Sequence, residues 1–462
     1  MKWIHIASAG LAAAWLVQAG VASAQEQQWL QDRRYREGIG YRVGDLELHP
    51  GFAGEFGYDS NMFLRADNEH PTDVFRIRIT PSLSLSTLGQ QRRGQDAGQA
   101  PPSVNFRATV AGIYNEYIAT KSNSPDDPSK FRNLGALGDF DLEINPQRPW
   151  GARLFGNLTR TIQPSNLSDT TAAYNRITAG AGGEVIWAPG GGLFDWRLGY
   201  NYLTTIFEEA RYKSLNSGTH TLETRGRWRF LPRTAFMFDA SQGFTRYSNP
   251  GAQTYLLNSD PLRTRIGLNG LVTDRVGFLA MVGWGSTFFN QGNTPRENYD
   301  GPIGQAQLTF YPTVAPTLTD TPREASLTLS QINLGYTRDF ADSYFGAFYE
   351  RDRGYLGVSY FFAGRVMTSL TAGVSRVHFP TLYFPAVAGA AAQPRSGAFN
   401  EARYDASLLA EYRFMDSLAV NTTLTYEQNN SKSIQYDPAN PALVDNLSWK
   451  RFQGFLGLRW FM

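Results

Sequence analysis

The strongest constraint on the fold is an alternation of apolar and polar side chains that recurs along most of this 462-residue chain. In residues 418–427, Leu418 and Leu424 share one parity, whereas Asn421 and Glu427 share the other. Similar alternation runs through 222–230 and 75–85. Because successive side chains of a strand point to opposite faces, each segment predicts a β-strand with one apolar and one polar face.

Composition and the placement of aromatic residues favour a membrane barrel over a soluble β-protein. Aromatic residues make up 14% of the chain and charged residues 18%, below the ~25% charge of an ordinary soluble domain. Trp228 and Trp460 fall at one end of the predicted strands, and Trp284 and Tyr426 at the other. Aromatic girdles at both membrane interfaces are typical of outer-membrane barrels. The alternative is a soluble sandwich or propeller, in which the aromatic side chains form the core.

The sequence therefore predicts an all-β fold, a transmembrane antiparallel β-barrel of about 18 strands, with 16 as the alternative. The links alternate between short and long, for example 231–233 against 428–450, which indicates short periplasmic turns and long extracellular loops. Two inner links, 88–102 and 311–324, are longer than this rule allows, so each is an insertion or a miscounted strand pair. The predicted strands are 46–57, 74–87, 104–116, 132–145, 151–163, 175–187, 194–206, 218–230, 234–246, 262–272, 276–288, 303–311, 326–339, 354–362, 365–377, 402–414, 417–428 and 450–461.

The first residues predict export. Residues 1–24 read as a secretory signal peptide, with an apolar stretch before the small residues Ala22-Ser23-Ala24. An N-terminal membrane anchor is the alternative. Beyond this stretch there is no apolar run of ~18 residues, the length a membrane helix needs. We therefore expect residues 25–45 to form an N-terminal periplasmic segment and residues 46–462 to form a barrel integral to the bacterial outer membrane.

The polar parity of each strand is expected to line the lumen. Eighteen tilted strands close at roughly 35 Å backbone diameter, wide enough for water. The basic candidates are Arg76, Arg78, Arg153, Arg225, Arg227, Arg229, Arg263, Arg265 and Arg403, and the acidic candidates are Asp139, Asp141, Glu143, Asp239, Asp405 and Glu411. A modest basic excess suggests an electrostatic filter for anionic solutes or acidic glycans. The alternative is a wetted wall whose charges neutralise one another.

Three arginines on one face, Arg225, Arg227 and Arg229, form the best site candidate. Like charges at this spacing repel unless carboxylates or a bound anion lie opposite them. The sequence predicts that Asp239 and its neighbours pair with these arginines, or that an anion does.

Sequence motifs for other functions are absent, so we expect neither an enzyme nor a cofactor or metal site. None of the five histidines shares metal-ligand spacing with another, and there is no cysteine. Gly190-Gly191-Gly192 lacks the lysine of a phosphate loop, and no Gly-x-Ser-x-Gly motif is present. The net charge of +2 also argues against a nucleic-acid partner.

Several strings resemble the β-barrel porin type 2 family. One is Gly44-Asp45-Leu46-Glu47-Leu48-His49-Pro50, followed by Gly57-Tyr58-Asp59-Ser60-Asn61-Met62-Phe63. Another is Leu334-Gly335-Tyr336-Thr337-Arg338-Asp339-Phe340, followed by Tyr344-Phe345-Gly346 and Glu350-Arg351-Asp352-Arg353. The resemblance implies an outer-membrane barrel. In some members of that family, the barrel is the membrane-spanning partner of a periplasmic polysaccharide-export protein.

Three functional hypotheses follow. The first is a conduit for an exported polysaccharide, docked to a periplasmic export protein. The second is a general or anion-preferring porin for small solutes, and the third is a structural or motility-related surface protein. In all three the barrel contacts outer-membrane lipid. The alternating last strand, 452–462, also resembles the signal read by the barrel-assembly machinery.

Overall fold

The fold is taken from a computed structural model of the whole chain. The structure describes residues 27–31, 37–88, 103–120, 127–146, 149–164, 173–189, 192–248, 258–289, 297–312, 330–343, 348–362, 364–383, 393–437 and 440–462. The predicted signal peptide, residues 1–24, lies outside the described residues, as do most of the links 88–102 and 311–324.

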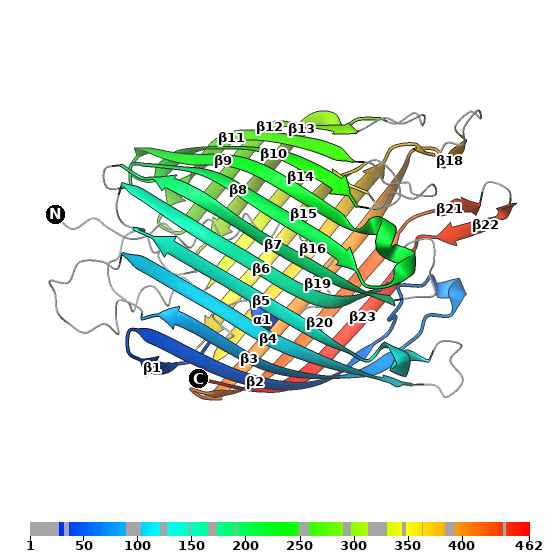
Figure 1. The fold of residues 1–462 in the computed structure, drawn as a ribbon, viewed down its shortest axis with the longest axis horizontal. Coiled ribbons are helices and arrows are strands. Elements are labelled where there is room, and N and C mark those ends of the chain that lie inside the picture. Colours follow the sequence, from blue (N-terminus) through cyan, green and yellow to red (C-terminus); the bar gives the residue numbers. More distant parts are fainter. Residues whose placement is uncertain are drawn as a thin grey trace.

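The described residues form one large sheet that closes on itself as an 18-strand antiparallel barrel (Figure 1). Neighbours in the chain pair along the ring, and the first and last barrel strands, β2 and β23, pair directly from Gly51↔Phe461 to Asp59↔Gln453. The barrel strands are β2 (Leu46–Asp59), β3 (Val74–Thr87), β4 (Val104–Ala119), β5 (Asn133–Ile144), β6 (Trp150–Pro164), β7 (Ala173–Trp187), β8 (Phe194–Phe207), β9 (Ser217–Leu231), β10 (Thr234–Tyr247), β11 (Ser259–Thr273), β12 (Val276–Phe289), β13 (Asp300–Phe310), β14 (Gln331–Asp342), β15 (Phe348–Phe362), β16 (Val366–Phe379), β19 (Phe399–Met415), β20 (Leu418–Asn430) and β23 (Trp449–Phe461).

The predicted count of 18 strands is confirmed, rather than the alternative of 16. Most boundaries agree within a few residues, but β14 begins later than predicted, at Gln331, and β15 begins earlier, at Phe348. At the long-loop end, strands such as β15 and β19 continue past the apolar band, where alternation gives way to charged pairs such as Arg338 with Asp352. A strand predicted from the apolar–polar alternation alone is therefore too short at the long-loop end of the barrel.

The short elements were not predicted. A short strand, β1 (Tyr41–Val43), pairs with β2 before the barrel begins. At the long-loop end two hairpins form, β17 (Leu382–Tyr383) with β18 (Pro394–Ser396), and β21 (Ser433–Asp437) with β22 (Asn440–Asn446). A single turn of α-helix, α1 (Gln28–Gln31), precedes them all. No helix in the described part of the chain is long and apolar enough to span a membrane.

The two faces of the wall differ as the alternation predicts. On β11, Ile266 and Leu268 are exposed on the outer surface, and Arg263 and Arg265 lie on the inner face. Most exposed large apolar side chains of the barrel strands have this outer parity. The sheet thus presents hydrocarbon to its surroundings and polar groups to its interior.

A buried ion pair ties the seam between the first and last strands. Arg451 on β23 donates from Nε to Asp59 Oδ1 on β2 at 2.9 Å, and a second guanidinium nitrogen pairs with the other carboxylate oxygen. Gln453 donates to Asp59 Oδ2 at 2.8 Å. Asp59 and Arg451 are both almost fully buried. A bidentate ion pair therefore stabilises the closure of the ring, in addition to the backbone hydrogen bonds between β2 and β23.

Candidate functional site

The inner wall of β6 to β9 carries a compact cluster of charges. Glu184 on β7 is buried and accepts from Arg225 Nη2 on β9 at 2.5 Å. Arg153 and Arg197, on β6 and β8, place Nη1 atoms 3.8 and 3.7 Å from its other oxygen. The strand register brings these residues together, since Arg153 lies opposite Glu184 and Arg197 lies opposite Arg225.

Further pairs continue this cluster on both sides. On β5 and β6, Arg153 Nε donates to Asp141 at 2.7 Å. The two other pairs are Arg265 with Asp239, on β11 and β10, and Arg263 with Asp339, on β11 and β14, each with a 3.0 Å contact. Asp239 lies opposite Arg225 in the register but pairs with Arg265 instead. We call the inner faces of β5 to β12 the charged wall.

The other residues predicted to line the lumen also lie on the inner face of the barrel, but they are not part of the Glu184 cluster. Their contacts are Arg76 with Asn115 Oδ1 at 2.7 Å, Arg78 with Glu55 at 3.0 Å, Arg403 with Glu401 at 2.6 Å, Asp405 with Arg353 at 2.5 Å, Glu411 with Arg413 and Arg459 at 2.8 Å each, and Glu143 with Asn105 at 3.4 Å. Asp139 lies in register with Thr109 and Asn157. The basic candidates are thus largely neutralised by carboxylates, as the wetted-wall alternative expects.

Two members of the predicted arginine run differ from the rest. Arg227 and Arg229 have no salt bridge within 4.0 Å among the described residues, while Arg225 is held by Glu184. Asp195 lies opposite Arg227 in the register but bonds to Arg197 at 3.1 Å. Both arginines lie near the short-turn end of β9, so the two guanidinium groups without a salt bridge lie near one mouth of the lumen.

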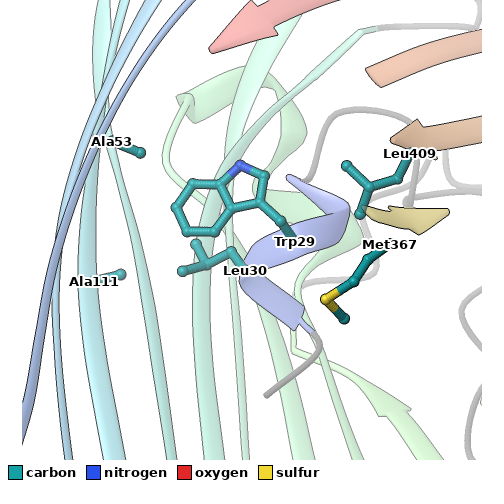
Figure 2. Close-up of a cluster of buried hydrophobic side chains, with 6 residues drawn as sticks. All are labelled: Trp29, Leu30, Ala53, Ala111, Met367 and Leu409. Carbon is teal, nitrogen blue, oxygen red and sulfur yellow. The ribbon is translucent and has the colours of Figure 1, made fainter. Parts of the chain in front are cut away.

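The lumen also contains a segment that sequence analysis did not place there. α1 lies inside the barrel (Figure 1), against a continuous arc of the inner wall that runs from β16 through β19, β20, β23, β2 and β3 to β4. Figure 2 shows Trp29 and Leu30 on α1, with Ala53 and Ala111 on one side and Met367 and Leu409 on the other. Residues 25–45 were expected to form a periplasmic segment. Instead, part of that segment packs inside the barrel.

Polar contacts hold α1 on the wall formed by β2, β3 and β20. Glu55 on β2 accepts from Trp29 Nε1 at 3.0 Å, and it also accepts from Gln27. The same carboxylate pairs with Arg78 and accepts from Asn421 Nδ2 at 3.3 Å. Because Glu55 is buried, these donors replace the water that its charge would otherwise require.

Contacts from β3, β19 and β23, on the same arc of the wall, also hold α1 and the adjoining Gln27. Thr80 donates to Gln27 Oε1 at 3.1 Å, and Gln28 bonds to Ser407 Oγ on β19. The Arg459 guanidinium carbon lies 4.2 Å from the Trp29 ring centroid, in cation–π geometry. Trp29 and Leu30 are only 3% and 1% exposed, and burying an apolar side chain of this kind contributes about 1.5–3 kcal/mol.

One signal in the sequence could have revealed this packing. Ala53, Ala111, Leu137, Met367 and Leu409 all have inner-face parity, where a water-filled lumen should show polar residues. They gather on β2, β4, β5, β16 and β19 rather than being spread around the ring. An apolar patch on the wet side of a barrel indicates that something covers it.

The closed ring defines the class of protein. Its backbone groups pair around the barrel, and its outer surface is apolar, which suits a bilayer and not water. The chain is therefore an integral outer-membrane β-barrel.

Comparisons with known proteins assign no narrower class. No family model matches the chain, and no curated protein matches it. Among solved structures, OpdQ of Pseudomonas aeruginosa is similar with a TM-score of 0.42 at 9% identity, over 91% of this chain and 99% of that one. The outer membrane protein OpdK of the same organism has the same score and identity, over 90% and 98%. The FrpB iron transporter of Neisseria meningitidis has a TM-score of 0.44 at 6% identity, over 89% and 81%.

Proposed function

We propose that this barrel is a diffusion channel for polar solutes, with a preference for anions, and that the solute path follows the charged wall. The observation that carries the proposal is the contrast between the two sides of the lumen. The side formed by β2, β3, β19, β20 and β23 is covered by α1 and its contacts. On the charged wall, by contrast, side chains such as Arg227, Arg229 and Asn269 remain partly or fully accessible.

Paired charges suit passage of hydrated solutes without tight binding. A wall whose arginines are matched by carboxylates stays wet, yet no single site holds an ion strongly. The preference for anions rests on Arg227 and Arg229, near the short-turn mouth, for which the described residues provide no salt bridge. Short turns face the periplasm in outer-membrane barrels, so this preference acts at the periplasmic mouth.

Conductance in a planar lipid bilayer tests this proposal. The purified protein is expected to give discrete current steps, and under a salt gradient the reversal potential should favour chloride over potassium. Absence of any steps in protein shown to be folded would contradict a channel, and cation preference would contradict the role of the two arginines.

An exported polysaccharide remains the second candidate cargo, favoured by the resemblance of residues 44–63 and 334–353 to the porin type 2 family. That resemblance also predicts a periplasmic export protein as partner. The test is deletion of the gene in the source bacterium. Loss of surface polysaccharide with precursors retained inside supports the conduit, and unchanged surface polysaccharide excludes it.

A further inference from the structure

The α1 segment bears on which solutes could pass. It contacts β2 and β4 on one side and β16 and β19 on the other (Figure 2), and these strands belong to one continuous arc of the ring, so α1 fills the part of the lumen that this arc encloses. A water-filled passage cannot run between α1 and this arc, because Trp29 and Leu30 are packed against its apolar side chains. The open cross-section is what lies between α1 and the charged wall.

We propose that α1 is a resident constriction that sets the size limit of the channel. This inference rests on the proposed function, since a size limit has meaning only if solutes pass. Trp29 is the main determinant, because it meets the Glu55 carboxylate, the Arg459 guanidinium and the apolar cluster at once.

The contacts indicate a fixed constriction and not a loosely held one. Removing α1 would leave Glu55 without two of its donors and expose Met367 and Leu409 to water. Charged and apolar contacts both oppose that exposure. The chain beyond α1 is also tied at the short-turn mouth, where Gly38 N donates to Met462 O at 3.2 Å.

A cysteine-free chain allows a direct test of where α1 lies. In one variant, Gln28→Cys and Ser407→Cys place two thiols at a site of direct side-chain contact. A cysteine at position 28 is shorter than the glutamine whose terminal amide reaches Ser407, so a short bifunctional thiol cross-linker, and not direct oxidation, should join the two thiols in the folded protein. Gln28→Cys alone is the matched control. Efficient joining shows that α1 is seated, whatever the channel does. Failure to join would overturn the placement of α1.

The second variant unseats α1 by substitutions in α1 itself, and a single cysteine in the wall reports on the result. Trp29→Ala with Leu30→Ala removes its apolar anchors, and a Leu409→Cys reporter, buried in the parent protein, should change from protected to labelled by a charged maleimide. Unit conductance is expected to rise roughly twofold or more, and larger neutral sugars should then enter reconstituted vesicles. The cross-linked Gln28→Cys, Ser407→Cys variant should conduct like the parent.

The outcomes separate the two proposals. If Leu409→Cys becomes labelled but conductance and size limit stay unchanged, the constriction is excluded and the channel stands. If Leu409→Cys stays protected in the double alanine variant, Trp29 is not the anchor that we propose. If neither the parent nor the unseated variant conducts, the channel itself is excluded, while the cross-linking result still reports the position of α1.

Discussion

At the scale of single residues, burial decides which charges matter to this barrel. Asp59 and Arg451 pair across the seam with almost no exposure, whereas Asp67 and Lys450 form a pair at the long-loop end that is more than half exposed. A buried pair that loses one member leaves an uncompensated charge, but an exposed pair loses little because water replaces the partner.

Asp59→Ala should therefore lower the free energy of unfolding by about 3–5 kcal/mol. Arg451 and Gln453 both lose their acceptor in this variant. The matched control is Asp67→Ala, expected to cost about 0–1 kcal/mol. Urea unfolding of both variants in lipid vesicles measures the difference, and equal losses would refute the role of the seam pair.

Arg227 and Arg229, which form no salt bridge with the residues that the structure describes, permit a prediction about selectivity. Arg229→Glu should shift the reversal potential toward cations, because it replaces a positive charge without a salt bridge near the mouth with a negative one. Arg233→Glu is the control, since Arg233 is an exposed turn residue paired with Asp274 at 2.6 Å. A shift of the same size in both variants would mean that net charge, and not the position of Arg229, sets the selectivity.

At the scale of strands, the sequence predicted most of what the structure contains. Alternation located all 18 barrel strands because lipid and water impose opposite demands on successive side chains. Alternation could not locate β1 or the loop hairpins, which are too short to show a period. It also could not place α1, whose position depends on contacts such as Gln27 with Glu55, 28 residues apart, and Gln28 with Ser407, 379 apart.

The ion-pair partners of the charged residues on the inner wall were harder to predict than the face of the strand on which each residue lies. From the sequence, either Asp239 and its neighbours or a bound anion was expected to pair with the run of arginines on β9. The structure matches Arg225 with Glu184, two strands away, and Asp239 with Arg265. Long arginine side chains reach past the adjacent strand, so register alone does not fix the pairs.

The outer face of β11 offers a test of strand orientation. Ile266 is 56% exposed at the middle of the strand, so Ile266→Arg should cost about 2–4 kcal/mol and impair assembly. Asn269→Arg, on the inner face of the same strand, should be tolerated. Folded yield in outer-membrane fractions measures both, and equal tolerance would argue against a lipid-facing Ile266.

At the scale of the whole molecule, closure of the ring is what makes the strands stable in a membrane. Open sheet edges are not tolerated in hydrocarbon, because their unpaired backbone groups find no partner there. The pairing of β2 with β23 therefore links the two ends of the barrel into one cooperative unit.

Deleting β23 should abolish the folded barrel, since β2 and β20 would each be left with an open edge. The strands β21 and β22 pair only with each other and not with a barrel strand. Deleting this hairpin should therefore leave the barrel intact. Resistance of the membrane-inserted protein to added protease distinguishes the two variants. A protected barrel without β23 would contradict closure at this seam.

The most direct test of the account is the pattern of water access along β11. Single cysteines at Arg263, Thr264, Arg265, Ile266, Leu268 and Asn269 would be treated with a charged, membrane-impermeant maleimide in reconstituted vesicles. We expect labelling at Arg263, Arg265 and Asn269, which face the lumen, and protection at Thr264, Ile266 and Leu268, which face lipid. Uniform labelling, or labelling of the opposite parity, would contradict a barrel with a wet interior and a lipid-facing exterior.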